Sequence, residues 1–242
     1  MGGDGRRHIV ATSGGFVPDG RGGWAVGPLI DHALRLSGAA QPRICYVGTA
    51  LGDQDWGVAA FYGAFAGRGD VVASHISLFP MPNVPDVAAH LLGQDVVWVG
   101  GGSVANLLAV WRLHGVDTAM RAAWEAGVVL GGVSAGSICW HVGGTTDSFG
   151  PDLRPVVDAL ALLPYGNGVH YDSEEQRRPL LHRLVADGTL PTSYATDDGA
   201  GPHYVDTELH EALTARRGAG AYVVRRGPAG DAIETPLPVR VL

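Results

Sequence analysis

The chain has 242 residues, of which 46% are hydrophobic and 17% charged, so it can bury a large core and dominant disorder is excluded. Its 17 basic residues, all of them Arg, face 24 acidic ones, and the net charge of −7 would repel a nucleic-acid backbone. Without Lys, Schiff-base and Ser-Lys catalysis are also excluded.

Short β-branched runs alternate with longer stretches of helical periodicity, a pattern typical of a parallel sheet covered by helices on both faces. Strands are predicted at residues 8–12, 43–48, 74–79, 95–99 and 128–133. Helices are predicted at 25–36, 56–65, 86–92, 103–113, 117–126 and 174–186. After residue 141, short alternating runs such as 221–225 indicate antiparallel edge strands. The last third lacks a core pattern of its own, which predicts a single domain over residues 1–242.

Cysteine usage and the absence of long apolar runs indicate the compartment. Cys45 and Cys139 cannot form a disulfide framework and lack the neighbours of a thiolate metal site. Residues 1–7 lead directly into a strand without the apolar stretch of a secretory signal. No run of 18 apolar residues, the length that spans a bilayer, occurs. We therefore expect a cytoplasmic protein that does not contact a membrane.

The segment Gly132-Val-Ser134-Ala-Gly136 has the spacing of a nucleophile elbow and lies between a β-branched run and a helical one. Such a turn needs small neighbours, and it lifts the Ser hydroxyl to where the amides of the next helix face developing negative charge. The alternative is that Ser134 only caps that helix.

A nucleophilic Ser134 needs a base within hydrogen-bond reach. Among the ten histidines, His170 is favoured, because residues 166–171 can form the next strand beside the elbow strand and bring the imidazole to the same sheet edge. A purely structural His170 is the alternative. Residues 100–102, three glycines after a predicted strand, could let backbone amides approach a substrate closely, or they could form a plain turn.

The base in turn needs an acid that orients it. Three aspartates lie between the two residues, namely Asp147, Asp152 and Asp158. Asp147 is favoured because it follows a turn-rich segment that can fold back over the elbow. An exposed aspartate that caps a turn is the alternative.

Four motifs together resemble one known family. They are residues 99–108 (VGGGSVANLL), 132–137 (GVSAGS), 145–148 (TTDS) and 170–172 (HYD) followed by 175–178 (EQRR). Their order and spacing resemble those of the peptidase E family, the serine peptidases that include aspartyl dipeptidase and, more distantly, cyanophycinase. The resemblance extends from the first strand to about residue 199.

The resemblance implies a three-layer αβα, flavodoxin-like fold related to class I glutamine amidotransferases. It also implies that Ser134 is the nucleophile, His170 the general base and Asp147 the acid. The backbone amides of Gly101 and Ala135 resemble those of an oxyanion hole. This chemistry requires no metal or organic cofactor.

The chain also departs from the family pattern. Ser103 replaces the Asn of the usual Gly-Gly-Asn, and Val169 replaces the Pro that commonly precedes the catalytic His. Glu174 lies where aspartyl dipeptidases have an Arg for the acidic side chain of the substrate, so we expect no preference for Asp-Xaa dipeptides. Arg177 and Arg178 could bind a substrate carboxylate or form salt bridges on a helix face.

The sequence thus predicts a serine hydrolase that cleaves short peptides in the manner of a dipeptidase. Its expected partner is a small peptide, with no nucleic acid and no membrane, and an exposed sheet edge makes a homodimer conceivable. One alternative is an α/β-hydrolase esterase, which would have several more strands after the elbow and a His near the C-terminus. The other is a non-catalytic binding module on the same fold.

Overall fold

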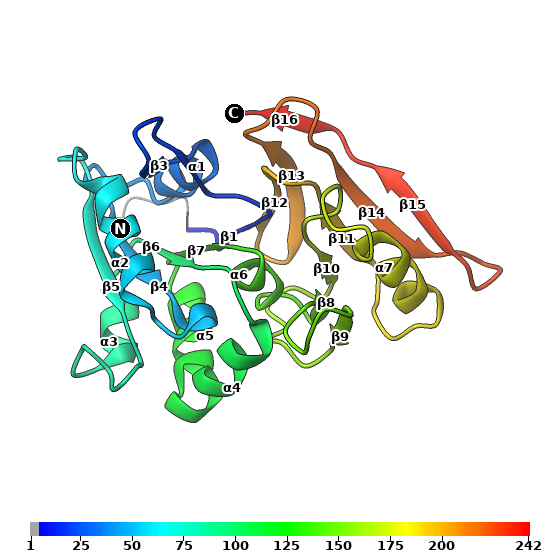
Figure 1. Cartoon of the computed structure of the whole chain (residues 1–242), viewed down its shortest axis with the longest axis horizontal. Helices are drawn as coiled ribbons and strands as arrows, with labels where there is room; N and C mark the ends of the chain where they lie inside the picture. The colour runs from blue at the N-terminus through cyan, green and yellow to red at the C-terminus, as the bar shows by residue number, and fades with distance from the viewer. Residues whose placement is uncertain (1–4) are drawn as a thin grey trace.

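The computed structural model describes residues 5–242, and its largest element is an eight-stranded sheet with the order β16-β13-β12-β1-β7-β6-β4-β5 (Figure 1). Five neighbouring strands are parallel: β1 (His8–Thr12), β4 (Arg43–Val47), β5 (Val72–Ile76), β6 (Val96–Val99) and β7 (Val129–Val133). Three further strands extend the sheet beyond β1: β12 (Ala200–Val205), β13 (Glu208–Thr214) and β16 (Val239–Val241). β12 is antiparallel to both β1 and β13, whereas β13 and β16 are parallel.

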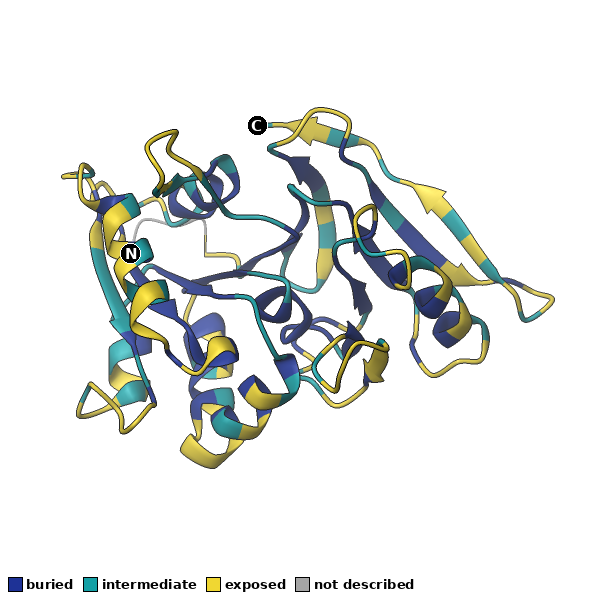
Figure 2. Cartoon of the chain, in the orientation of Figure 1, coloured by how far each residue is buried: buried dark blue, intermediate teal, exposed yellow. Residues whose placement is uncertain are grey.

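Helices cover both faces of the parallel strands, which gives the α/β fold three layers. The helices are α1 (Pro28–Leu36), α2 (Asp55–Phe65), α3 (Val87–Leu92), α4 (Val104–His114), α5 (Val116–Glu125) and the short α6 (Ala135–Ile138), with a 3₁₀ turn at Thr49–Leu51. Successive residues of β1 point to opposite faces, so Ile9 packs into one buried cluster and Val10 into the other. Figure 2 shows the buried strands in the middle and exposed residues on the outer helix faces.

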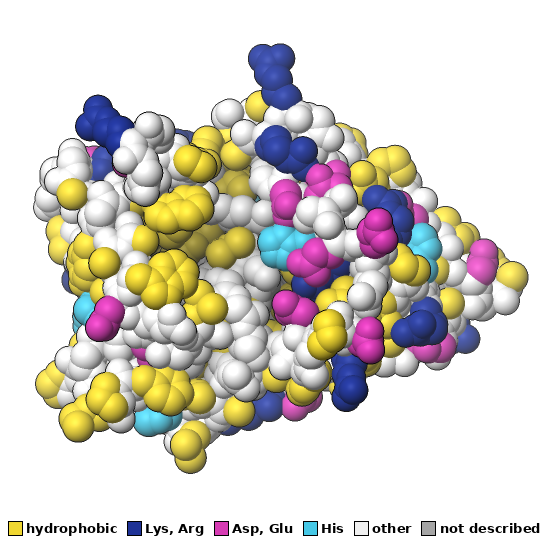
Figure 3. All heavy atoms as spheres, viewed as in Figure 1, with side chains coloured by type: hydrophobic (Ala, Val, Ile, Leu, Met, Phe, Trp, Pro, Cys, Tyr) yellow, Lys and Arg dark blue, Asp and Glu magenta, His cyan; other side chains and the backbone are white. Residues whose placement is uncertain are grey.

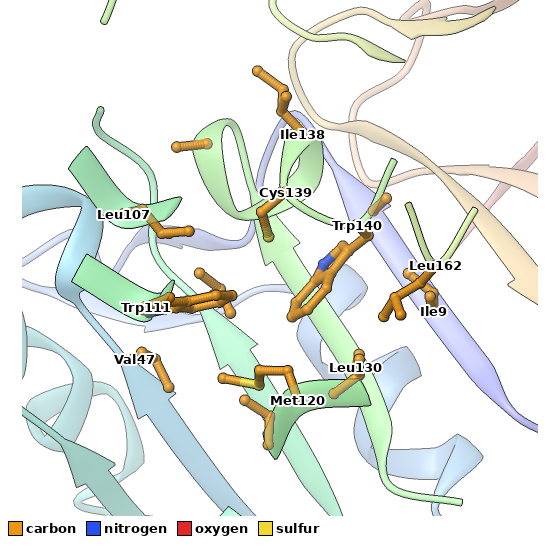
Figure 4. Close-up of a cluster of buried hydrophobic side chains, with 14 of the residues drawn as sticks. Ile9, Val47, Leu107, Trp111, Met120, Leu130, Ile138, Cys139, Trp140 and Leu162 are labelled. Atoms are coloured by element: carbon orange, nitrogen blue, oxygen red, sulfur yellow. The ribbon is translucent and has the colours of Figure 1, made fainter. Parts of the chain in front are cut away.

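The larger buried cluster lies between the sheet and α4, α5 and α6. In Figure 4, Trp111 of α4 and Met120 of α5 lie with Val47 and Leu130 of the sheet, and Cys139 after α6 joins the same cluster. Burial therefore holds the start of α6 firmly against the strands.

A second sheet of six strands, in the order β15-β14-β11-β10-β8-β9, was not expected from the sequence. Its strands are β8 (Gly143–Thr146), β9 (Arg154–Val156), β10 (Gly166–Gly168), β11 (Ser193–Thr196), β14 (Ala221–Arg226) and β15 (Ala232–Pro236), and α7 (Arg177–Ala186) packs on it. A hairpin of β2 (Phe16–Pro18) and β3 (Trp24–Val26) was missed as well. The strands β2, β3 and β8 to β11 have three or four residues each, which is too short for a periodicity to reveal them.

The prediction that residues 166–171 form the strand next to β7, the strand that leads into Ser134, is wrong. β10 pairs with β8 and β11 in the second sheet, whereas β7 lies between β1 and β6 in the first. A buried hydrogen bond of 3.0 Å between Ser137 Oγ of α6 and Asn167 Oδ1 of β10 links the two sheets. Buried residues of both sheets also share one hydrophobic cluster. The single domain over residues 1–242 stays a prediction, and residues 1–4 of that range lie outside the described residues.

The other predicted elements agree with the structure to within a few residues, including the antiparallel strands late in the chain. In residues 5–242, no helix has the length and apolarity needed to cross a bilayer.

His141 follows α6 and is completely buried. Its ring is held between the Ser137 carbonyl oxygen, 2.9 Å from Nδ1, and the Tyr204 hydroxyl, 3.2 Å from Nε2. Burial lowers the pKa of His141 from 6.5 to about 4, although the hydrogen bond to Ser137 raises it in part. The imidazole is therefore neutral in the folded protein at neutral pH.

This burial predicts a pH-dependent stability. As the pH falls from about 6.5 to about 4, the unfolded chain binds a proton at His141 that the folded chain does not, so the free energy of unfolding decreases. The group accounts for a loss of roughly 3 kcal/mol over this range. In denaturant titrations at several pH values, His141→Gln should flatten the decrease, while the exposed His114→Gln should retain the wild-type slope. An unchanged slope in His141→Gln would contradict the assignment.

Candidate active site

Ser134 lies in a tight turn between β7 and α6. Its backbone has φ 57° and ψ −113°, a conformation that residues other than glycine rarely adopt and that is concentrated at functional sites. A Cβ atom at Gly132 would lie 2.4 Å from the carbonyl oxygen of Gly136, and one at Gly136 would lie 2.3 Å from that of Val99. The turn therefore requires both glycines of the motif for steric reasons.

The carboxyl end of β1 joins the segments that carry the polar residues of the site. The Ser134 amide donates to the carbonyl oxygen of Thr12 at 3.0 Å. The His170 amide donates to Ser13 Oγ at 3.2 Å. The Gly199 amide donates to the carbonyl oxygen of Ser13 at 2.9 Å. Thr12, the last residue of β1, and Ser13, which follows it, thus bind the backbones of three segments that are far apart in the sequence.

His170 has a carboxylate partner that the sequence analysis did not consider. Its Nδ1 lies 2.5 Å from Oδ1 of Asp198. The two residues follow β10 and β11, which are parallel neighbours with Gly168 opposite Ala195, so both side chains reach the same sheet edge. A neutral imidazole that donates Nδ1–H to this carboxylate keeps an unprotonated Nε2, the form that can act as a base.

Further polar groups hold Asp198 in place. Its amide donates to Asp172 Oδ1 at 2.8 Å, and its carbonyl oxygen accepts from Arg216 Nε at 2.8 Å. Arg216 also forms an ion pair with Asp172. Burial alone would raise the pKa of Asp172, but the Asp198 amide and Arg216 lower it overall. The backbone that carries Asp198 is therefore fixed on both sides.

The structure brings Asp198, rather than Asp147, to His170. Asp147 is exposed after β8, and within residues 5–242 no hydrogen bond joins its carboxylate to His170. Asp152 is exposed, and Asp158 forms an ion pair with Arg112 at 3.0 Å. Asp198 lies outside the segment between Ser134 and His170, where the acid was expected, because it follows both residues in the chain. The signal in the sequence is a pair of aspartates, Asp197 and Asp198, directly before Gly199.

Glu174 and Arg177, the expected substrate contacts, bind each other instead. Arg177 is buried, its Nε donates to Glu174 at 2.8 Å, and its Nη1 donates to the carbonyl oxygen of Thr145. Arg178 lies over the ring of Tyr171 and pairs with Glu234. These contacts join α7 to the second sheet, so the structure gives the two arginines a packing role.

The residues expected to form an oxyanion hole lie beside Ser134. A Cβ atom at Gly101 would lie 3.2 Å from Cβ and 3.9 Å from Oγ of Ser134. Ala135 is the first residue of α6, so its amide has no acceptor within the helix. In the described part of the chain, Ser134 Oγ forms no hydrogen bond with His170, and the hydroxyl can rotate about its Cα–Cβ bond.

A cavity of about 390 Å³ opens next to these residues, and Gly101, Val133, His170 and Asp198 are part of its wall. Most of the wall is apolar. Its aromatic residues are Phe16, Trp24, Tyr46, Trp56, Phe61 and Trp98. Asp198 is the single Asp, Glu or Arg in the part of the wall that the described residues form. Figure 3 shows the corresponding hydrophobic hollow with a histidine and acidic side chains at its margin.

Comparison with known proteins agrees with this arrangement. Residues 10–212 match the family model of Peptidase family S51. The chain belongs to this family. It is 40% identical over 231 residues to the Bacillus subtilis (strain 168) protein named Uncharacterized peptidase YgaJ, covering 94% of this chain and 98% of that one. It is 30% identical over 156 residues to Peptidase E of Streptomyces coelicolor, covering 59% of this chain and 58% of that one.

The fold is also similar to a solved structure. The crystal structure of a peptidase from an acI-B1 Actinobacterium superposes with a TM-score of 0.70 at 10% identity, covering 98% of this chain and 96% of that one. Together, the family match and the relatives identify the S51 protein as a serine-type peptidase of the peptidase E kind. This membership argues against both alternatives, the α/β-hydrolase esterase and the non-catalytic module.

Proposed function

We propose that this S51 peptidase cleaves short peptides through Ser134, His170 and Asp198. The observation that carries the proposal is the 2.5 Å contact between His170 Nδ1 and Asp198 of the second sheet. Thr12 and Ser13 hold the backbone of this histidine and that of Ser134, in its strained turn, next to each other. The turn acts as a nucleophile elbow next to the part of the cavity wall that Gly101 and Val133 form. Rotation of the Ser134 hydroxyl toward Nε2 of His170 completes the triad when substrate binds, as catalytic hydrogen bonds often tighten in the complex.

In the first half-reaction, Ser134 Oγ attacks the peptide carbonyl carbon while His170 Nε2 takes the hydroxyl proton. Asp198 keeps the imidazole in the correct tautomer and stabilises its charged form. His170 then donates the proton to the leaving amine, which leaves an ester on Ser134. In the second half-reaction, a water molecule activated by His170 hydrolyses this ester and regenerates the enzyme.

The tetrahedral intermediates carry a negative charge on the former carbonyl oxygen. The backbone amides of Gly101, which lies beside Ser134, and of Ala135, which follows it, donate hydrogen bonds to this oxygen. Each such donor contributes about 3 kcal/mol to stabilisation of the transition state. The position of Ala135 at the start of α6 adds a favourable backbone dipole, although this helix has a single turn.

Removal of the nucleophile tests the proposal most directly. Ser134→Ala should fold like the wild type and lose turnover of a dipeptide library by ~10³-fold or more, because the attacking hydroxyl is absent. A fluorophosphonate probe should label the wild type at Ser134 and leave the variant unlabelled. Ser37→Ala, at a serine that follows α1, is the control and should keep full activity. Equal turnover in Ser134→Ala and the wild type would refute catalysis by this residue.

A second pair of variants identifies the acid of the triad. Asp198→Asn should lower kcat by ~10³ to 10⁴-fold, because an amide in this place favours the wrong imidazole tautomer. Asp147→Asn, which changes an exposed carboxylate without contact to His170, should keep wild-type kcat. Steady-state kinetics with a single dipeptide distinguish the two. A loss confined to Asp147→Asn would return the role of the acid to that residue.

The shape and lining of the cavity also indicate which kind of substrate side chain, next to the scissile bond, the enzyme prefers. A volume of about 390 Å³ suits one side chain together with the backbone of a short peptide. Its aromatic walls stabilise an apolar side chain, whereas the carboxylate of Asp198 repels an acidic one. We therefore keep the expectation that Asp-Xaa dipeptides are not preferred. The physical reason is no longer repulsion by Glu174, because Glu174 is paired with Arg177. Instead, the lining of the cavity disfavours an acidic side chain.

Peptides that differ in their N-terminal residue test this preference. We expect Phe-Xaa and Leu-Xaa dipeptides to be cleaved with higher kcat/KM than Asp-Xaa. Trp56 lines the cavity but is 58% exposed, so Trp56→Ala should fold normally and lower kcat/KM for Phe-Xaa by about 10-fold, with a smaller effect on Ala-Xaa. Leu113→Ala, at an exposed residue of α4, is the control. Preferred cleavage of Asp-Xaa would contradict the proposed substrate class.

A further inference from the structure

Four histidines and a glutamate gather at the end of the larger sheet that lies opposite Ser134. His8 is the first residue of β1, and His32 lies in α1. His203 lies in β12, and the neighbouring strand β13 carries His210 and Glu211. Figure 1 shows α1 close to β1 and β13 at this end of the sheet. The catalytic residues need none of these side chains.

Three of these residues point one donor atom each at a common centre. His32 Nε2 and His203 Nδ1 are 3.4 Å apart, and Glu211 Oε1 lies 3.6 Å from His203 Nδ1 and 4.0 Å from His32 Nε2. Two ligands of a tetrahedral Zn²⁺ ion lie about 3.3 Å apart. The first separation already fits this value, and the widest, between His32 Nε2 and Glu211 Oε1, would have to close by about 0.7 Å.

The three donors have the protonation states that metal ligands require. Burial lowers the pKa of His32 to about 4 and that of His203 to about 3, so both imidazoles are neutral at pH 7 and keep a lone pair. The hydrogen bonds from Arg240 lower the pKa of Glu211 to about 2, so its carboxylate is ionised.

Neighbouring residues orient the donors as outer partners do in metal sites. His203 Nε2 lies 3.0 Å from His8 Nδ1, which leaves His203 Nδ1 to face the centre. Arg240 binds both oxygens of Glu211, at 2.7 Å and 2.8 Å, and fixes the plane of the carboxylate. A cleft of about 280 Å³, lined by all three donors and by His210, gives an ion access from solvent and room for a water molecule as a fourth ligand.

We propose that His32, His203 and Glu211 form a binding site for a divalent transition-metal ion, with Zn²⁺ as the best match. Two imidazoles and one carboxylate suit Zn²⁺, Ni²⁺ or Cu²⁺, whereas Mg²⁺ prefers an all-oxygen site. The ion cross-links α1 to β12 and β13 and so stabilises the fold. The positive charges of Arg35, at the cleft, and Arg240 oppose a dication, so binding is weaker than in a structural zinc site with several thiolates.

Titration calorimetry of the whole protein with ZnCl₂ tests the site. The wild type should bind one Zn²⁺ per chain, with MgCl₂ giving no comparable heat. His32→Gln and Glu211→Gln each remove one donor from a less buried position than His203, and each should weaken binding by ~100-fold or more. Zn²⁺ should also raise the Tm of the wild type, and this rise should disappear in both variants.

Two further variants separate this site from other metal-binding groups. His170→Gln, which removes an imidazole near two carboxylates of the active site, should bind Zn²⁺ like the wild type, and so should His114→Gln at an exposed position. His32→Gln should keep wild-type kcat/KM, since His32 of α1 is not part of the wall of the active-site cavity. No binding to the wild type, wild-type affinity in His32→Gln and Glu211→Gln, or loss of binding in His170→Gln would each overturn the proposal.

Discussion

The carboxyl end of β1 is the constraint on which the active site depends. Thr12 and Ser13 accept hydrogen bonds from the backbone amides of Ser134, His170 and Gly199, so three loops from two sheets converge on the last residue of β1 and the residue after it. Two of the acceptors are carbonyl oxygens, and the third is the Ser13 hydroxyl, which a hydrogen bond of 2.7 Å to Thr196 Oγ1 holds in place. The scaffold therefore positions these residues by binding their backbones, independently of their own side chains.

A second constraint is steric. The turn at Ser134 exists only because Gly132 and Gly136 leave space for neighbouring carbonyl oxygens, and Ser134 and His170 both have positive φ. Such backbone conformations cost of order 1 to 3 kcal/mol each. The buried cluster beneath α6 and the buried hydrogen bond from Ser137 to Asn167 offset this cost. The strained backbone at Ser134 and His170 thus depends on the packing of the core beneath it.

Local patterns were sufficient for some of the site residues and insufficient for others. Ser134 was found because its motif requires a strand before it and a helix after it, and both requirements can be read along the chain. His170 was found for a reason that is partly wrong, since its strand lies in a second sheet rather than beside β7. Asp198 was missed because the pairing of β10 with β11, which brings it to His170, leaves no periodic signal in strands of three or four residues.

The sequence alone determined the α/β layer pattern, the parallel strands, most helix boundaries and the turn that carries Ser134. These depend on short-range properties, namely hydrophobic periodicity and the steric freedom of glycine. Tertiary structure decided the partner of His170, the packing role of Arg177 and the aromatic wall of the cavity. Each of these features depends on contacts between segments that are far apart in the chain. The pairing of strands decides which distant residues meet, and the composition of a single segment does not reveal that pairing.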